Sequence, residues 1–440
     1  MYRLLMDELI KWKNNKDRKP LILKGIRQCG KTYLLKEFGE KYYTDIAYFN
    51  FEGNESLQDR FERDLDCSRI IEELSILRGK PIKKEETLII FDEIQFCNKA
   101  LSSLKYFCEN MPGYHIVSAG SLLGIALSKP LPFPVGKVDF LTLYPMSFYE
   151  FLLANGEDML CEYLQELPNN EVVSALFTDK LENYLRSYYI TGGMPEVVDK
   201  WVKTKDISLI EDIQKKILDS YELDFAKHAP IKDYPKLSLI WKSIPNQLAR
   251  ENNKFMYSNV KKGLRGKDLE DALQWLISAG LVYRVSRIEK PFIPLEAHAD
   301  QVYFKLYMPD IGLLRKVAGL PAGAILEKNN LFTEFKGALT ENYVLCELIK
   351  INNGNIYYWK SQNIAEVDFV IGFGTKIIPI EVKSERNTKS RSLTEYRKRY
   401  NPEISLLISM NNISGEKIKN IPLYLLWKIK DYCGSQTSYV

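Results

Sequence analysis

The octapeptide from Gly25 to Thr32 constrains this chain more than any other stretch, because it fits the pattern G-x4-G-K-[S/T]. It follows the apolar run 20–23 and precedes a helical pattern over residues 32–38. In such a loop the glycines let the backbone curl, so that its N–H groups and the start of the next helix face an anion. The sequence therefore predicts a strand, a phosphate-binding loop and a helix, in that order. The loop residues are Gly25, Ile26, Arg27, Gln28, Cys29, Gly30, Lys31 and Thr32.

Two side chains of this loop have the chemistry that a nucleoside triphosphate needs. Lys31 would reach the β- and γ-phosphates, and the hydroxyl of Thr32 would hold Mg²⁺. A chance match in a turn is the alternative, but a strand before the loop and a helix after it argue against chance. We therefore expect a nucleoside triphosphate and Mg²⁺ as ligands.

A second motif lies at 87–93, where four apolar residues are followed by Asp92 and Glu93. Ligands collect at the carboxyl ends of buried parallel strands, so we expect Asp92 near the Mg²⁺ and Glu93 beside the attacking water. An acidic strand end without function is the alternative. Ser121 ends a further strand candidate, 115–121, where it would sense the γ-phosphate, orient water or cap a helix that begins at Leu122.

The alternation of strands and helices predicts an α/β fold, with helices on both faces of a parallel sheet. The composition is that of an ordinary soluble globular protein, with 45% hydrophobic and 27% charged residues and a net charge of +4. Seven cysteines without a C-x-x-C pair favour a reducing, cytoplasmic setting. The three histidines are far apart in the sequence, and no apolar run is long enough for a bilayer, so we expect neither histidine-ligated zinc nor a membrane partner.

The chain resembles the bacterial and archaeal ATPases that join an AAA-type N-terminal domain to a C-terminal domain of unknown function. The resemblance rests on the loop around Arg27 and on the segments 91–93, 118–121, 143–148, 189–196 and 305–314. It implies that the nucleotide is ATP and that the first domain is an ATPase. Many members have Gly-Arg where this chain has Gly136-Lys137, and lysine lacks the planar fork that clamps a γ-phosphate. We therefore leave open whether Lys137 replaces an arginine finger.

The sequence predicts three parts: an ATPase domain over 1–155, a helical and winged-helix middle over 156–325, and an α/β domain over 326–440. In the middle part, residues 268–278 show the spacing of one apolar helix face, with Asp268 suited to the N-cap and Gly280 to the C-terminal stop. Two strand candidates follow, at 281–285 and 302–306. A helix followed by two strands is the outline of a winged helix.

Basic residues before this helix favour contact with DNA, but its first turn argues against it. Asp268, Glu270 and Asp271 would repel phosphate there. A winged helix that only packs between domains is the alternative. The basic residues are Lys261, Lys262, Arg265 and Lys267.

The last part contains Asp368 on one strand candidate, and Glu381 and Lys383 on the next. Residues two apart in a strand share a face, so Glu381 and Lys383 point the same way. This pattern resembles the PD-(D/E)xK nucleases, in which the two carboxylates would hold Mg²⁺ and the lysine would position water. Glu341 lies on an otherwise apolar helix face, and the same resemblance would bring it to that metal site.

A basic run over 383–399 includes Tyr396 and would suit a phosphate backbone, although a solvated helix face is the alternative. Two functions therefore stay open. In the first, ATP controls a nuclease-like domain that binds DNA or RNA. In the second, nucleotide state drives a switch that acts through a protein partner or self-association, and the last domain is catalytically inactive.

Overall fold

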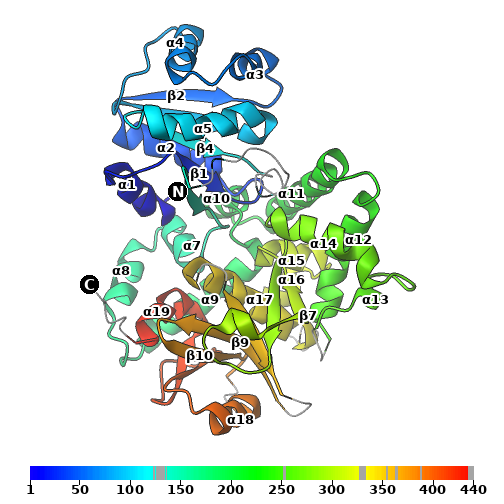
Figure 1. Ribbon diagram of the computed structural model, residues 1–440. Coiled ribbons are helices and arrows are strands. Elements are labelled where there is room, and N and C mark those ends of the chain that lie inside the picture. The colour runs from blue at the N-terminus through cyan, green and yellow to red at the C-terminus, as the bar shows by residue number, and fades with distance from the viewer. Residues whose placement is uncertain are drawn as a thin grey trace. The chain divides into compact units, whose positions relative to one another are not determined.

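A five-stranded, all-parallel sheet contains β1, the strand before the phosphate loop, in the computed structural model, and its strand order is β2-β3-β4-β1-β5. Figure 1 labels β1, β2 and β4 of this sheet. The structure describes residues 1–121, 124, 134, 136–250, 254–326, 333–352, 355–361, 365–386 and 389–434. The strands are β1 (Leu21–Lys24), β2 (Asp45–Asn50), β3 (Thr87–Asp92), β4 (His115–Ala119) and β5 (Asp139–Thr142). The helices are α1 (Leu5–Asn14), α2 (Lys31–Tyr42), α3 (Glu55–Glu62), α4 (Cys67–Arg78) and α5 (Asn98–Asn110).

Helices cover both faces of this sheet, as the sequence predicts. All six residues of β3 are buried, and they alternate between two helical layers. Ile89 and Phe91 join the apolar cluster that α3, α4 and α5 line, whereas Leu88 packs against Gly39 of α2. A strand buried on both faces must be apolar along its whole length, which explains the unbroken apolar run before Asp92.

The chain divides into two compact units. The phosphate-loop unit contains residues 2–144 and 278–281, and the mixed-sheet unit contains residue 1, residues 145–277 and residues 282–440. The mixed-sheet unit begins with helices α7 (Phe148–Ala154), α8 (Asp158–Glu166), α9 (Ala175–Thr191), α10 (Pro195–Thr204), α11 (Ile207–His228), α12 (Tyr234–Leu248), α13 (Tyr257–Val260) and α14 (Gly266–Ser278). Its later helices are α15 (Ile311–Val317), α16 (Ala322–Leu326), α17 (Thr333–Asn352), α18 (Arg391–Tyr400) and α19 (Ile429–Tyr432).

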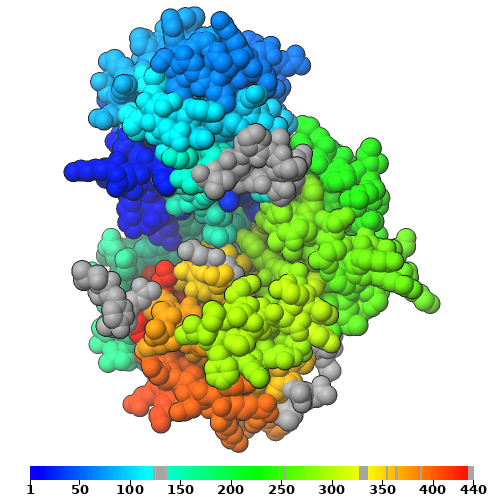
Figure 2. Space-filling model, viewed as in Figure 1, coloured from blue at the N-terminus to red at the C-terminus, as the bar shows by residue number. Residues whose placement is uncertain are grey.

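Its sheet has seven strands in the order β12-β11-β10-β9-β8-β6-β7, with parallel and antiparallel pairs. The strands are β6 (Tyr283–Ile288), β7 (Ala299–Tyr307), β8 (Ile356–Lys360), β9 (Glu366–Phe373), β10 (Lys376–Val382), β11 (Ser405–Ser409) and β12 (Ile418–Pro422). The two strands expected of the wing, β6 and β7, continue this sheet, because β6 pairs with β8. In the space-filling view the yellow-green atoms of this segment adjoin the orange atoms of the later strands (Figure 2). The boundary expected at 325/326 therefore crosses one continuous sheet.

The two faces of this sheet differ in chemistry. On one face, Leu393 and Tyr396 of α18 pack on Trp359 and Val367 in an apolar cluster. Helix α17 lies against β8 and β10 and carries Glu341 to a polar cluster. The order of elements therefore places carboxylates from a helix and from neighbouring strands together.

Three of the segments that carry the family resemblance meet in the mixed-sheet unit. The N–H of Met146 donates to the carbonyl oxygen of Gly193 over 2.7 Å, and the N–H of Gly193 donates to Oδ2 of Asp310 over 2.6 Å. A Cβ atom on Gly192 would lie 2.2 Å from Oδ1 of Asp310, so only glycine fits there. The segments 143–148, 189–196 and 305–314 thus share one buried junction.

Two local expectations differ from the structure or lie outside it. Helix α14 begins at Gly266, so Asp268 lies within its first turn and accepts a hydrogen bond from the N–H of Arg265 (2.9 Å) instead of standing at the N-cap. Gly280 has a φ of 73°, as a helix stop requires. The helix expected to begin at Leu122 lies outside the described residues.

Candidate functional site

The phosphate loop connects the end of β1 to the start of α2, and its backbone conformation depends on glycine. Gly25 has a φ of 153° and Gly30 a φ of 93°, and Gly30 caps the helix. A Cβ atom on Gly25 would lie only 2.4 Å from the carbonyl oxygen of Leu143. Gln28 also lies in the left-handed region, with a φ of 64°. The loop is therefore a curled backbone that a side chain at Gly25 would disrupt.

The two polar side chains at the start of α2 point to different groups. The buried Nζ of Lys31 donates to the carbonyl oxygens of Gly25 and Ile26, each over 2.9 Å, and lies 3.4 Å from Oγ of Ser121. The hydroxyl of Thr32 donates to Oδ2 of Asp92 over 2.8 Å. The predicted lysine, hydroxyl and strand-end carboxylate thus come together.

Glu93 lies beside this group, in a conformation that is unusual for a glutamate. Its φ of 51° and ψ of 43° are left-handed, which costs a non-glycine residue about 1–2 kcal/mol. Its Oε1 accepts from the Ser121 hydroxyl over 3.1 Å, and its Oε2 accepts from Nε2 of Gln95 over 2.5 Å. Ser121 follows β4, which lies between β1 and β3, so one side chain links the end of β4 to the end of β3 and to the start of α2.

These residues fit ATP and Mg²⁺. A hydroxyl beside a carboxylate offers the hard oxygen ligands that Mg²⁺ prefers, with phosphate and water oxygens completing its shell. The curled loop and the start of α2 offer N–H groups to phosphate. The structure brings Lys31, Thr32, Asp92, Glu93 and Ser121 together, and their roles are proposed below.

Sequence reasoning missed three residues that support this group. Arg3 is 5% exposed, and its guanidinium donates to the carbonyl oxygens of Cys29 (3.0 Å) and Tyr144 (2.5 Å). The hydroxyl of Tyr48 donates to Oδ2 of Asp92 over 2.8 Å. Arg3 gave no sequence signal, whereas Tyr48 and Gln95 lie in or next to the strands that the motifs identified, where a search for polar neighbours would have found them.

Lys137 forms an ion pair on the surface of its own unit. Its Nζ lies 3.0 Å from Oε1 of Glu109 in α5. This contact gives Lys137 a partner within the chain. It does not decide whether Lys137 replaces an arginine finger.

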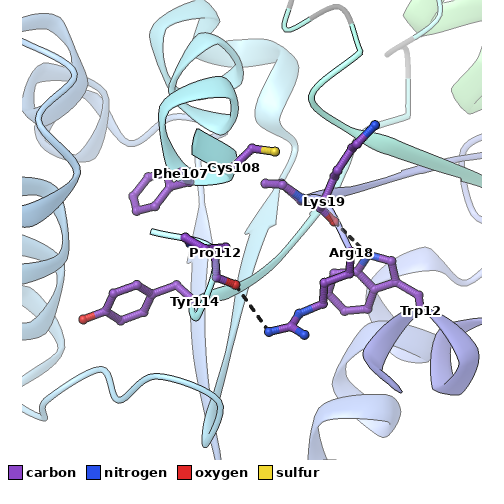
Figure 3. Close-up of a pocket in the computed structure, with 8 residues that line it drawn as sticks. Trp12, Arg18, Lys19, Phe107, Cys108, Pro112 and Tyr114 are labelled. Carbon is purple, nitrogen blue, oxygen red and sulfur yellow. Dashed lines mark hydrogen bonds between the residues drawn. The ribbon is translucent and has the colours of Figure 1, made fainter. Parts of the chain in front are cut away.

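A small cavity lies at the other end of this sheet (Figure 3). Its lining residues precede β1 and β4, whereas the phosphate loop follows β1. Its volume is about 10 Å³, which is room for about one water molecule and not for a substrate. The lining residues are Trp12, Arg18, Lys19, Pro20, Phe107, Cys108, Pro112 and Tyr114.

The second predicted group lies in the mixed-sheet unit. Lys383 lies 2.8 Å from Oε1 of Glu381, and Oδ2 of Asp368 accepts from the N–H of Val382 over 2.7 Å. Burial, then the carboxylates of Glu381 and Glu341, raises the pKa of Asp368 well above its ordinary value. Burial also raises the pKa of Glu381, although Lys383 acts in the opposite direction.

Glu341 has partners that the sequence did not indicate. Its Oε1 lies 3.0 Å from Nζ of Lys305 and accepts a hydrogen bond from the hydroxyl of Tyr307, both from β7. Lys305 also lies 2.8 Å from Oε1 of Glu366. The fit of this group to Mg²⁺ is poor, because the described residues contain no group of three acidic, histidine or cysteine side chains that could hold a metal ion.

Several basic side chains of the run over 383–399 contact groups within the chain. Arg386 pairs with Glu182 in α9, and Arg399 pairs with Glu395. Arg397 donates to Oγ of Ser405 over 2.8 Å, and Tyr396 is buried in the apolar cluster under α18. Tyr396 therefore packs in the core and cannot stack on a base, and much of the predicted charge is engaged within the chain.

Lys261, Lys262 and Arg265, which precede α14, are exposed, as is Lys267 in its first turn. Glu270 and Asp271 are exposed too. Among the described residues, no helix combines the length and the apolar character that crossing a membrane requires. All seven cysteines are free thiols.

Three families match separate segments of the chain. Residues 17–152 match the family described as an AAA domain, residues 182–323 match a domain of unknown function (DUF8612), and residues 336–426 match another (DUF4143). No curated protein matches the chain.

Similar solved structures include a Walker-type ATPase, a branch migration motor and a protein in complex with DNA. The Walker-type ATPase PABY2304 of Pyrococcus abyssi is 15% identical, with 71% of this chain and 94% of that chain covered and a TM-score of 0.44. The RuvB Holliday junction branch migration motor of Thermotoga maritima is 14% identical, with 65% and 90% covered and a TM-score of 0.30. The Orc1 protein of Aeropyrum pernix, solved in complex with DNA, is 12% identical, with 73% and 92% covered and a TM-score of 0.27.

These scores are too low to add detail, so the assignment rests on the parallel sheet, the phosphate loop and the family matches. Residues 17–152 thus match an AAA domain and contain the parallel sheet and the phosphate loop, and the chain continues through two segments that match domains of unknown function.

Proposed function

We propose that this chain binds ATP with Mg²⁺ and hydrolyses it at the group formed by Lys31, Thr32, Asp92, Glu93 and Ser121. The observation that carries the proposal is the link from Ser121 to both Lys31 and Glu93, at 3.4 and 3.1 Å. This link places a cation, a carboxylate and a hydroxyl at one point beside the phosphate loop. Positioning and charge stabilisation are what phosphoryl transfer requires of a protein.

Each residue has a separate task in this proposal. Lys31 turns from the carbonyl oxygens of its own loop to the β- and γ-phosphates of ATP. Thr32 and Asp92 hold the Mg²⁺, which would neutralise charge on the phosphates. Glu93 orients the attacking water and accepts its hydrogen bond, and Ser121 holds the Glu93 carboxylate in position.

ATP binding and phosphate release test this function directly. The wild-type chain should release phosphate with Mg²⁺ and not with EDTA. Lys31→Ala should lose both ATP binding and turnover, whereas Lys41→Ala, an exposed lysine at the far end of the same helix, should keep both. ATP binding by Lys31→Ala at the wild-type affinity would refute the assignment of the loop.

We further propose that nucleotide state controls the mixed-sheet unit, for which two outputs compete. In the first, the unit is nuclease-like and binds DNA or RNA through the group Glu341, Asp368, Glu381 and Lys383. In the second, it is catalytically inactive, and the chain is a switch that acts through a protein partner or self-association. The contact of Lys305 with Glu341 favours the second output, because it occupies a carboxylate that a metal would need.

Cleavage assays separate the two outputs. Under the first, the full chain cuts DNA or RNA with Mg²⁺ or Mn²⁺, with ATP present or absent, and Glu381→Ala and Lys383→Ala abolish cutting without changing ATP turnover. Under the second, no nucleic acid is cut under any of these conditions. The free thiols support a reducing, cytoplasmic site of action for either output.

A further inference from the structure

Lys305 is a charged side chain in the interior of the mixed-sheet unit. Its side chain is 1% exposed, and its Nζ lies 3.0 Å from Oε1 of Glu341 and 2.8 Å from Oε1 of Glu366. The same Nζ lies 4.9 Å from the centre of the Tyr358 ring. A buried ammonium is retained in a protein only where opposite charges and hydrogen bonds compensate its lost hydration.

The neighbours of Lys305 supply that compensation. Burial alone would lower the pKa of Lys305, but Glu341, Glu366 and Asp368 together raise it above its usual value. The same ammonium lowers the pKa of Glu366 against the effect of burial. Lys305 therefore stays protonated, and it balances carboxylates contributed by α17 and β9.

A divalent cation would need carboxylate oxygens of the same cluster. Mg²⁺ requires near-octahedral oxygen ligands at about 2.0–2.1 Å, so ligands must converge on one point. Oε1 of Glu341 already contacts both Lys305 and Tyr307, and Oε1 of Glu381 contacts Lys383. No three acidic side chains converge in the way a metal requires, within the residues whose placement is described.

We infer that the ammonium of Lys305 takes the place of the divalent cation in this nuclease-like cluster, which makes it a charge-balanced centre that needs no metal. The centre joins α17 to β7 and β9 through fixed ion pairs. This inference rests on the second output proposed above, in which the mixed-sheet unit is catalytically inactive. Its chemistry is separate from ATP turnover.

Binding of Mn²⁺ to the nucleotide-free full chain tests this inference. The probe is Mn²⁺ alone, followed by electron paramagnetic resonance and by thermal melting. The wild-type chain should have no Mn²⁺ site in this cluster. Asp368→Asn and Glu381→Gln should therefore bind as much Mn²⁺ as the wild type. Lys305→Met removes the ammonium but keeps the length of the side chain, and it should gain a Mn²⁺ site that is about tenfold or more tighter than any in the wild type.

Two further variants make the result specific. The new site should disappear in Lys305→Met combined with Asp368→Asn. Lys360→Met, which removes another lysine that contacts Glu366, should gain no Mn²⁺ site. Mn²⁺ should also restore part of the melting temperature that Lys305→Met loses.

The outcomes that overturn the inference are equally distinct. A wild-type Mn²⁺ site that Asp368→Asn abolishes contradicts it, and this comparison needs no substitution at Lys305. A folded Lys305→Met chain that gains no Mn²⁺ affinity contradicts it too. ATP turnover, measured on the same samples, reports separately on the function proposed for the phosphate-loop unit.

Discussion

The hydroxyl of Ser121 donates a hydrogen bond to Oε1 of Glu93 over 3.1 Å, and so joins the end of β4 to the end of β3. The backbone N–H of Ser121 also lies 3.4 Å from the other carboxylate oxygen of Glu93. Ser121 lies beside Lys31 as well. Its hydroxyl is therefore placed to contact the γ-phosphate of ATP and to hold the Glu93 carboxylate. The sequence placed Ser121 at a strand end, and the structure shows which groups it contacts.

We predict that Ser121→Ala slows ATP turnover and leaves ATP affinity nearly unchanged. Without the hydroxyl, Glu93 is held less firmly, and part of the rate that a positioned base contributes is lost, so turnover should fall about tenfold or more. Steady-state phosphate release and a nucleotide titration measure the two quantities. Ser102→Ala, at a half-buried serine in α5, is the matched control. Equal turnover in Ser121→Ala and the wild type would remove Ser121 from the site.

Arg3 should stabilise the phosphate loop, because its guanidinium holds the carbonyl oxygen of Cys29 in that loop. Arg3→Ala leaves the carbonyl oxygens of Cys29 and Tyr144 without a charged donor, which should cost about 1–3 kcal/mol in the free energy of unfolding. ATP affinity should fall as the loop loosens. Arg3→Lys should not restore either quantity fully, because an ammonium lacks the planar fork that reaches both oxygens. Urea titration and ATP titration give the two readings, with the exposed Arg63→Ala as control.

Gly25→Ala should abolish ATP binding, whereas substitution of an exposed glycine should not. The added Cβ would lie 2.4 Å from the carbonyl oxygen of Leu143, at a φ of 153°, so the loop must move. Gly53→Ala is the control, because Gly53 also has a positive φ, of 66°, but no atom within 4 Å of the added Cβ. We expect Gly53→Ala to cost about 1 kcal/mol and to bind ATP normally. Similar ATP affinities in the two variants would contradict the close approach at Gly25.

The free energy of unfolding of the phosphate-loop unit should decrease as the pH is lowered, because of His115. Burial, helped by Arg18 and Lys13, lowers the pKa of His115 to about 4, from 6.5 in an unfolded chain. The unfolded chain therefore takes up a proton between these values while the folded chain does not, so stability is lost as pH falls from about 7 to 5. The loss should be about 2 kcal/mol.

Urea titrations at both pH values test this dependence. Because the hydroxyl of Tyr43 pairs with Nδ1 of His115, the combined change His115→Phe with Tyr43→Phe removes the titrating group without leaving an unpaired hydroxyl. This variant should lose most of the pH dependence. His298→Gln, at a half-buried histidine of the mixed-sheet unit, should retain it. A pH dependence that survives in the double variant would assign it to other groups.

The phosphate-loop unit could be predicted from sequence because its signals are local. The loop follows an apolar strand, and parallel strands bring their carboxyl ends to one edge, which is why Asp92 and Thr32 were expected together. Arg3 could not be foreseen, because its contact with Cys29 spans 26 residues and follows no local periodicity.

The mixed-sheet unit was harder to predict because its neighbours are distant in sequence. The sequence indicated two strands after a helix, in the outline of a winged helix, but no local pattern says that β6 pairs with β8 across about 70 residues. The pairing matters, because it brings Lys305 to Glu341, 36 residues away, and to Glu366. Glu341, Asp368 and Glu381 were therefore identified from sequence, whereas Glu366 and the cation, Lys305, were not.

The most direct test of the proposed ATPase is the Glu93→Gln variant, which keeps the shape of the side chain and removes its charge. ATP affinity should match the wild type, because Lys31, Thr32 and Asp92 are unchanged, while phosphate release should fall about a hundredfold or more. Glu86→Gln, an exposed glutamate just before the other end of β3, should change neither quantity. Phosphate release by Glu93→Gln at the wild-type rate would contradict the proposed catalytic role of Glu93.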